Sequence, residues 1–306
     1  MELEVNKIYQ GDVLQVLKTF PDEFVDCIVT SPPYYGLRDY GVEGQIGLEK
    51  TLNEYLDKML AITAELKRVL KKTGTMWWNH GDSYASLGRV GGDIDVDEGM
   101  DINRGRGRIK KGDYPEKSLL LQAHRLAIRM IDEQGWILRN TIIWHKPNVM
   151  PSSVKDRFTV DYEPVFFFTK AKRYWFGQQF ESTIELYSEK RARRPQTSHG
   201  KEPTPSGNSN NLTYNKLFPL GRNKRSVWKI ATKLYKEAHF ATFPPELITI
   251  PIKAGCPLNG IVLDSFMGSG TTAYVARQLG RNYIGIELNP EYIKMAEKRF
   301  AQQILT

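Results

Sequence analysis

The sequence predicts an α/β protein with a doubly wound, mostly parallel β-sheet, and two patterns support this class. Short apolar segments typical of buried strands alternate along the chain with segments whose apolar residues recur at helical spacing. A glycine-rich segment also separates a strand from a helix near the C-terminus, and two prolines follow a strand near the N-terminus. The length of 306 residues allows one large domain with a smaller appendage.

The first half of the chain begins with this alternation. Residues 26–30 (DCIVT) predict a strand that leaves the sheet at Pro32, because proline has no N–H to donate. Apolar residues over 52–70 recur at helical spacing, and Gly74 is expected to lie just past the end of that helix. Residues 81–117 are rich in Gly, Asp and Arg without periodicity, which predicts a long mobile loop. The expected order is strand 5–9, helix 13–20, strand 26–30, helix 52–70, strand 75–78, helix 118–134, strand 136–144 and strand 164–169.

In the second half the alternation stops and later resumes. Residues 186–225 are rich in Arg, Lys, Ser, Asn, Pro and Gly and show no clear period, so they are expected to interrupt the α/β pattern. From residue 244 the expected order is a helix to 254, strand 261–263, a glycine-rich turn, helix 271–279, strand 283–286 and helix 290–304. Both halves are therefore expected to contribute strands to one sheet.

Positive charge is concentrated in one part of the chain. Residues 170–229 hold 13 Lys or Arg against 4 Asp or Glu, a local charge of +9, whereas the whole chain carries +8. The remainder therefore sums to −1. A basic segment beside a neutral body suggests that a polyanion binds there, and nucleic acid is the leading candidate. The side chains of this segment expected to contact DNA are Arg191, Arg193, Arg194, Arg222, Lys224 and Arg225. Arg38 is added from the aromatic and basic loop 35–41, for which a plain solvated loop is the alternative.

Composition excludes several other classes of protein. Two cysteines, Cys27 and Cys256, are too few for a disulfide framework or a cysteine-rich zinc site, and no metal is expected. The first ten residues carry charges without an apolar core, unlike a signal peptide. No apolar run approaches the length of about 18 residues that a membrane-spanning helix needs. We therefore expect a cytoplasmic protein without a membrane partner.

A nucleoside site is predicted by the glycine-rich segment 264–272 (DSFMGSGTT). Gly268 and Gly270 let the backbone turn tightly and approach a ligand, and the following helix offers free N–H groups. The next strand ends in Glu287, whose carboxylate can accept both hydroxyls of a ribose. Ala273 stands where a dinucleotide fingerprint has its third glycine, which favours a ligand without phosphate. For this segment alone, a plain strand-to-helix connection is the alternative.

The prolines near the N-terminus belong to the segment Thr30-Ser31-Pro32-Pro33-Tyr34. Together with DSFMGSGTT, in this order and with both at strand ends, it resembles the permuted class of DNA amino-methyltransferases. The likeness covers nearly the whole chain. It implies a circularly permuted, seven-stranded Rossmann-like methyltransferase sheet that carries a basic target-recognition insertion.

The resemblance also implies a division of the chain and its partners. Residues 1–170 would form the catalytic half, 171–236 the target-recognition region and 237–306 the cofactor-binding half. S-Adenosylmethionine is the implied methyl donor, and double-stranded DNA is the implied substrate. The resemblance leaves open whether a cognate restriction endonuclease is a partner, and whether the protein is a monomer or a dimer.

Amino methylation accounts for the residue types of the proline segment. An exocyclic amine is a poor nucleophile because its lone pair is delocalised into the ring. The Ser31 hydroxyl and the Pro32 carbonyl can accept hydrogen bonds from the two N–H groups and so localise that lone pair. Pro33 stiffens the segment without adding a donor, and Tyr34 offers a face on which a flipped-out base can stack. Neither cysteine follows a proline, as the nucleophile of C5-cytosine methylation would, so a carbon target is not expected.

Further residues are assigned to the methyl donor by the resemblance. Asp12 matches a family position that contacts the adenine, although it could also cap the next helix. Residues 239–244 resemble the segment that holds the methionine carboxylate, with a plain loop-to-helix entry as the alternative. Trp77, Trp78 and Asn79 end a neighbouring strand, where they could line the pocket, although either tryptophan could equally belong to the core. The full expected cofactor set is Asp12, Phe240, Thr242, Phe243, Asp264, Phe266, Gly268, Ser269, Gly270, Thr271, Thr272 and Glu287.

The target base and three rival functions stay open. In the family, Ser at the first position of the proline segment goes mostly with N4-cytosine, and Asp or Asn mostly with N6-adenine. Ser31 therefore favours cytosine, with N6-adenine methylation as the first rival. An NAD-dependent oxidoreductase would use the glycine-rich turn but would leave residues 31–34 unexplained. A catalytically dead DNA-binding module and an RNA substrate are the remaining alternatives, and the intact motifs argue against a dead site.

Overall fold

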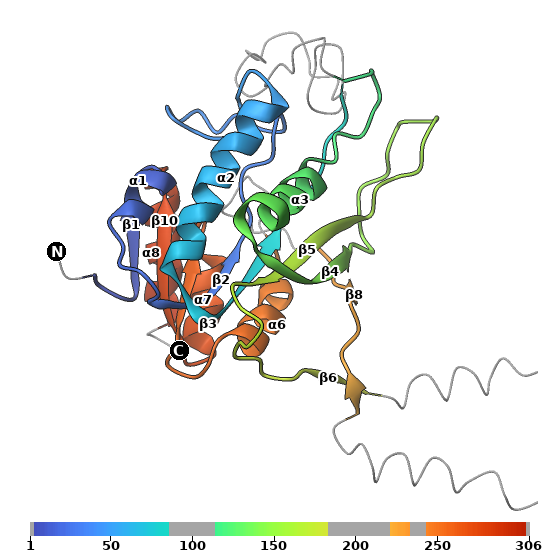
Figure 1. Cartoon of the computed structure of the whole chain (residues 1–306). Helices are drawn as coiled ribbons and strands as arrows, with labels where there is room; N and C mark the ends of the chain where they lie inside the picture. The colour runs from blue at the N-terminus through green and yellow to red at the C-terminus, as the bar shows by residue number, and fades with distance from the viewer. Residues whose placement is uncertain (1–2, 86–113, 183–220, 233–242, 304–306) are drawn as a thin grey trace, which may run out of the picture. The chain divides into compact units, whose positions relative to one another are not determined.

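A computed structural model describes residues 3–85, 114–182, 221–232 and 243–303 (Figure 1). The chain divides into a large unit, formed by Met1–Gly177 and Ser226–Thr306, and a small unit, Gln178–Arg225. None of the described helices is long and apolar enough to cross a membrane.

The large unit is built on one sheet in the order β1-β10-β9-β2-β3-β5-β4-β8. Within it only β5 runs antiparallel to its neighbours. This confirms the predicted α/β class with a mostly parallel sheet, although the described residues form eight strands of the sheet where seven were expected. The strands are β1 (Lys7–Gln10), β2 (Val25–Thr30), β3 (Leu70–Asn79), β4 (Ile137–His145), β5 (Tyr162–Thr169), β8 (Val227–Lys229), β9 (Ile261–Asp264) and β10 (Asn282–Glu287).

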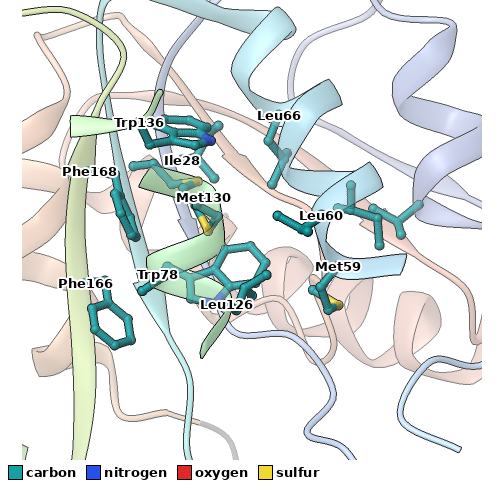
Figure 2. Packing of buried hydrophobic residues seen from close by; sticks show 14 of the residues in the cluster. Ile28, Met59, Leu60, Leu66, Trp78, Leu126, Met130, Trp136, Phe166 and Phe168 are labelled. Atoms are coloured by element: carbon teal, nitrogen blue, oxygen red, sulfur yellow. The ribbon is translucent and has the colours of Figure 1, made fainter. Parts of the chain in front are cut away.

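Helices cover both faces of the sheet, as a doubly wound fold requires. One apolar cluster joins the sheet to α1 (Val13–Lys18), α2 (Leu52–Val69) and α3 (Gln122–Gln134). The other joins it to α6 (Pro245–Gly255), α7 (Thr271–Gln278) and α8 (Pro290–Gln303). Figure 2 shows Trp78, Trp136 and Phe168 from the first cluster around helix residues such as Met130 and Leu66.

The alternation of strand side chains assigns residues to these two clusters. Ile28 of β2 packs in the first cluster, and its neighbours Cys27 and Val29 pack in the second. On β3, Trp78 joins the first cluster, whereas Trp77 joins the second and stacks on a phenylalanine of β5 at 4.1 Å between ring centroids. Both tryptophans are thus core residues, which is one of the two roles left open for them.

The structure differs from the prediction at two helix boundaries, the end of α2 and the start of α3. Strand β3 begins at Leu70, directly after α2, so Gly74, which was expected just past the end of the helix, lies inside a strand. Helix α3 begins at Gln122 instead of residue 118, because Leu121 adopts φ +55°. The segment just before it is held by backbone bonds from Ala85 to the Ser118 carbonyl and from Leu120 to the Ser83 carbonyl. The expected mobile loop between these elements falls mostly on residues 86–113, which lie outside the described residues.

The predicted target-recognition region, residues 171–236, does not coincide with one structural unit. Its last part contains β8, which extends the main sheet beside β4. The small unit within it contains β6 (Phe180–Glu181) paired antiparallel with β7 (Arg222–Asn223). Strand β1 belongs to the predicted catalytic half, residues 1–170. It nevertheless pairs with β10, which belongs to the predicted cofactor-binding half, residues 237–306.

The described strands bring their polar ends to one edge of the sheet. The first six strands in the sheet order contribute Asp12 after β1, Glu287 at β10, Ser265 after β9, Ser31 after β2, Asn79 at β3 and Glu163 near the start of β5. Glu163 joins this edge because β5 is antiparallel, so its first residues lie beside the last residues of β3. Ligands of doubly wound proteins bind at this edge.

Candidate active site

A cavity of about 780 Å³ lies at the carboxyl edge of the sheet. One part of its wall comes from residues 31–34 after β2, and another from Ser265–Ser269 after β9 together with Glu287. The two segments that carried the sequence argument, more than 230 residues apart in the chain, thus share one cavity because β2 and β9 are neighbours. Further wall residues are Asp12, Leu37, Arg38, Tyr40, Asn79, Trp144, Lys146, Met150, Phe243 and Thr271.

The proline segment presents its serine beside a directed chain of hydroxyl groups. The Tyr34 hydroxyl donates to the Glu163 carboxylate at 3.1 Å and lies 3.3 Å from the Ser31 hydroxyl. Because Tyr34 gives its proton to the carboxylate, Ser31 donates to Tyr34 and keeps its lone pairs as acceptors. Burial, together with the charge of Glu163, raises the pKa of Tyr34 well above its ordinary value, so the phenol keeps that proton.

Tyr34 is held against the end of β3. Its ring centroid lies 5.3 Å from that of His80, with the planes tilted by 30°. A Cβ at Gly81 would stand 2.5 Å from the ring, so this position needs glycine. These two residues back the ring, and the ring itself lines the cavity.

Glu287 and the glycine-rich turn form the other end of the cavity. The two Glu287 oxygens accept the backbone N–H groups of Gly268 at 2.7 Å and Asn289 at 2.8 Å. Burial raises the pKa of Glu287 above its ordinary value. A Cβ at Gly268 would meet no atom within 4 Å, and the buried Ser269 hydroxyl has no hydrogen-bond partner among the described residues. Open space and a spare hydroxyl beside an acid suit a polar ligand with hydroxyl groups.

Three residues expected to contact the cofactor, Asp264, Gly270 and Thr272, are not among the residues that line the cavity. Asp264 is fully buried and accepts hydrogen bonds from the hydroxyls of Thr30 at 2.7 Å and of Thr272. Burial raises the Asp264 pKa to about 6. Gly270 faces helix α8, because a Cβ there would stand 2.7 Å from Ala296. These residues shape the turn and tie β2 to it.

The remaining predicted cofactor residues are distributed as follows. Asp12 caps α1 by accepting the Gln15 N–H at 3.0 Å and also lines the cavity. Phe243, Phe266 and Thr271 line the cavity. Phe240 and Thr242 lie outside the described residues.

Sequence reasoning missed the polar pair Lys146 and Glu163 in the cavity wall. They form an ion pair, and the Lys146 ammonium lies 4.4 Å from the ring centroid of Trp144. Asn79, which the sequence predicts at the pocket, donates from its amide to Glu163 at 3.2 Å. Charged residues at the ends of two predicted strands were visible in the sequence. Their convergence was not, because it depends on β5 being antiparallel.

The expected DNA contacts lie in different parts of the chain. Arg38 lines the cavity. In the small unit, Arg222 and Arg225 both pair with Glu181, at 2.7 and 2.6 Å, and Lys224 lies on the same segment. The residues 191, 193 and 194 lie outside the described residues. Among the described residues, no group of three or more His, Cys, Asp or Glu side chains could hold a metal ion.

Comparison with known proteins agrees with this geometry. A family model described as DNA methylase matches residues 25–298, and the chain belongs to this DNA methylase family. Type II methyltransferase M.XycI of Xanthomonas campestris pv. cyanopsidis is 41% identical over 305 residues, covering 98% of this chain and 89% of the relative. Type II methyltransferase M.Cfr9I of Citrobacter freundii is 41% identical over 303 residues with the same coverage.

A solved structure extends the comparison to three dimensions. The PvuII DNA methyltransferase, named as cytosine-N4-specific, is 25% identical and superposes with a TM-score of 0.60, covering 96% of this chain and 86% of that chain. The family makes this chain a DNA methyltransferase that uses S-adenosylmethionine, which removes the oxidoreductase alternative.

Proposed function

We propose that the chain transfers a methyl group from S-adenosylmethionine to the exocyclic N4 nitrogen of a cytosine flipped out of double-stranded DNA. The observation that carries this proposal is the single cavity shared by the Ser31–Tyr34 segment and the Gly268–Glu287 pair. A base presented at one end would meet a methyl donor held at the other, and such positioning supplies much of the rate enhancement.

The residues of the cofactor end fit the donor by their chemistry. S-Adenosylmethionine, when bound, supplies a methyl group on a positively charged sulfur. Glu287 accepts ribose hydroxyls through the lone pairs that Gly268 and Asn289 leave free, and the Ser269 hydroxyl provides a spare polar partner. Asp12 is assigned to the adenine and the segment 239–244 to the methionine carboxylate, although residues 239–242 lie outside the described residues.

At the catalytic end, the chain's own groups activate the amine. Ser31 accepts one N–H of the exocyclic amine, because its own proton is committed to Tyr34. The Pro32 carbonyl accepts the other N–H. Both acceptors draw the nitrogen towards a pyramidal geometry and localise its lone pair for attack.

Replacing Ser31 tests this activation. We expect Ser31→Ala to lower kcat by about 100-fold, in line with the loss of one oriented polar group at a reacting centre, with little change in the Kd for S-adenosylmethionine. Single-turnover methyl transfer and calorimetric titration measure the two quantities. An Ala variant with the wild-type kcat would remove Ser31 from the mechanism.

The choice of cytosine rests on Ser31 and on the cytosine-N4-specific relative. Mass analysis of nucleosides from DNA modified by the purified protein identifies the base directly. N4-Methylcytosine is the expected product, and N6-methyladenine as the sole product would overturn the proposal in favour of its rival. Methylome sequencing of the same DNA gives the recognition sequence.

DNA binding is assigned to the basic residues. Arg38 at the cavity contacts the backbone near the flipped base, and the region 171–236, with Arg222, Lys224 and Arg225, recognises the target. Removing a phosphate contact should weaken binding to all DNA sequences. It should also reduce the slope of the logarithm of the binding constant against the logarithm of the salt concentration by about one unit. Filter-binding titrations of Arg38→Gln across salt concentrations would measure this, and an unchanged slope would exclude a phosphate contact.

A further inference from the structure

Beneath the proline segment lies a chain of three buried polar groups. The Pro33 carbonyl accepts a hydrogen bond from the Tyr55 hydroxyl of α2 at 2.9 Å. That hydroxyl lies 3.0 Å from Nε2 of His80, whose Nδ1 lies 3.3 Å from the indole nitrogen of Trp78. Tyr55, His80 and Trp78 are at most 1% exposed, and none of them lines the cavity.

The two ends of this chain fix the direction of every proton in it. An indole N–H can only donate and a carbonyl oxygen can only accept, so Trp78 donates to Nδ1 of His80 and Tyr55 donates to Pro33. Burial lowers the His80 pKa to about 3 and outweighs the Gln122 side chain, which raises it, so the imidazole is neutral near pH 7. Because Nδ1 accepts from Trp78, the one imidazole proton is on Nε2. Nε2 therefore donates to the Tyr55 oxygen.

This direction matters because it leaves the Tyr55 proton with one acceptor. With the opposite tautomer, Nε2 would be an acceptor and would compete with Pro33 for the Tyr55 proton. The indole of Trp78 therefore selects the tautomer that secures the bond to Pro33.

The Pro33 carbonyl orients the segment around it. A proline ring fixes φ but leaves ψ, and with it the direction of the carbonyl, to be set from outside. Beyond Tyr34, the next peptide is held as well. The Tyr35 N–H donates to the Gln122 side chain at 2.8 Å, and the Tyr35 carbonyl accepts from Ser83 at 3.2 Å. The backbone is therefore clamped on both sides of Tyr34.

We propose that Trp78, His80 and Tyr55 form a one-directional hydrogen-bond chain that positions the catalytic turn for methyl transfer. The three act through the Pro33 carbonyl, and His80 also packs against the Tyr34 ring, so they are positioning residues and touch neither base nor methyl donor. The inference rests on the proposed function, because it takes Ser31 and Pro32 as the acceptors that must be placed.

The first test removes the Tyr55 hydroxyl and keeps its ring, which packs 5.6 Å from that of Tyr35. We expect Tyr55→Phe to lower kcat by about 10- to 100-fold, as a misplacement of about 1 Å does, with the KM for DNA and the Kd for S-adenosylmethionine within about twofold of wild type. Thr63→Val is the matched control. It removes another buried hydroxyl of α2, bonded to Leu60 and Gln134, and should lower the thermal midpoint without changing kcat.

The second test addresses the direction of the chain. In His80→Gln the terminal amide nitrogen takes the place of Nε2 and can still donate to Tyr55, whereas His80→Asn reaches only the place of Nδ1. We expect the Gln variant to keep kcat within about fivefold of wild type and the Asn variant to fall to the Tyr55→Phe level. Nitrogen-15 imidazole spectra of the wild-type protein should show a protonated Nε2 and a bare Nδ1.

The outcomes separate this inference from the proposed function. A wild-type kcat in Tyr55→Phe together with an inactive Ser31→Ala overturns the positioning chain alone. Wild-type activity in both overturns the proposed function as well. Equal losses of kcat in Tyr55→Phe and Thr63→Val would assign the effect to stability and overturn the inference, as would a proton on Nδ1 in the spectra. The spectra apply even if Tyr55→Phe does not fold.

Discussion

The Glu287 carboxylate combines two tasks in one residue. Each of its oxygens accepts one backbone N–H, from Gly268 or from Asn289, which holds the glycine-rich turn against the end of β10. Each oxygen also keeps a lone pair for a ligand hydroxyl. Glutamine cannot do both, because its NH₂ group must face one of the two backbone donors.

We therefore expect Glu287→Gln to weaken S-adenosylmethionine binding by about 10- to 100-fold, equivalent to about 1–3 kcal/mol for an unsatisfied polar group. Isothermal titration calorimetry measures the Kd. Glu291→Gln is the control, because its exposed carboxylate pairs with Lys294 and should leave the Kd unchanged. A Glu287→Gln protein with the wild-type Kd would place the ribose elsewhere.

At the scale of elements, the connection from β9 to α7 uses two glycines for two different reasons. Gly268 has φ +51° and faces open space, whereas Gly270 has φ +78° and packs against α8 beside Ala296 and Phe300. Both backbones are left-handed, which costs a residue with a side chain about 1–2 kcal/mol. Only at Gly270 would a Cβ also overlap a neighbour.

The two alanine variants should therefore fail differently. In Gly270→Ala, overpacking should lower the unfolding free energy by a further amount of about 1–3 kcal/mol. This variant should therefore show the larger drop in thermal midpoint. Gly268→Ala should fold with the smaller loss but place its methyl group in the cavity and raise the Kd for S-adenosylmethionine more. Calorimetric melting and ligand titration of the pair check this, and an identical ranking in both measurements would contradict it.

For the whole molecule, two buried titratable groups oppose each other as the pH changes. His80 has a folded pKa of about 3, below its ordinary 6.5, so the unfolded chain binds the extra proton and stability falls as the pH drops below about 6.5. Asp264 has a folded pKa of about 6, above its ordinary 3.8, so the folded chain binds the extra proton and stability rises as the pH drops from about 6 to 4. Between pH 4 and 6 the two contributions offset.

His80→Gln should uncover this balance. Because the variant lacks the destabilising contribution of His80, its unfolding free energy relative to wild type should rise by up to about 1.4 kcal/mol for each unit by which the pH falls between about 6.5 and about 3. Urea unfolding at several pH values measures the difference, in which all other groups cancel. Parallel plots of unfolding free energy against pH for the two proteins would show that His80 does not stay neutral in the folded protein.

Much of this architecture followed from local signals. The alternation of strands and helices, the glycine-rich turn and the proline segment each occupy short windows whose residue types restrict the backbone, so their positions were correct to within a few residues. The start of α3 was missed because a bridge between Tyr84 and Leu119 overrides helical spacing. Strand β8 was missed because three residues carry too weak a pattern.

The sequence by itself determined the class of fold, the family and the two motifs of the site, because these depend on residue types at fixed local spacing. Only the tertiary structure decided which residues meet. It joined Glu163 and Lys146 to Tyr34, bonded Thr272 to the buried Asp264, and placed Tyr55 under Pro33. These contacts arise from strand order, strand direction and helix packing, which no short stretch of sequence encodes.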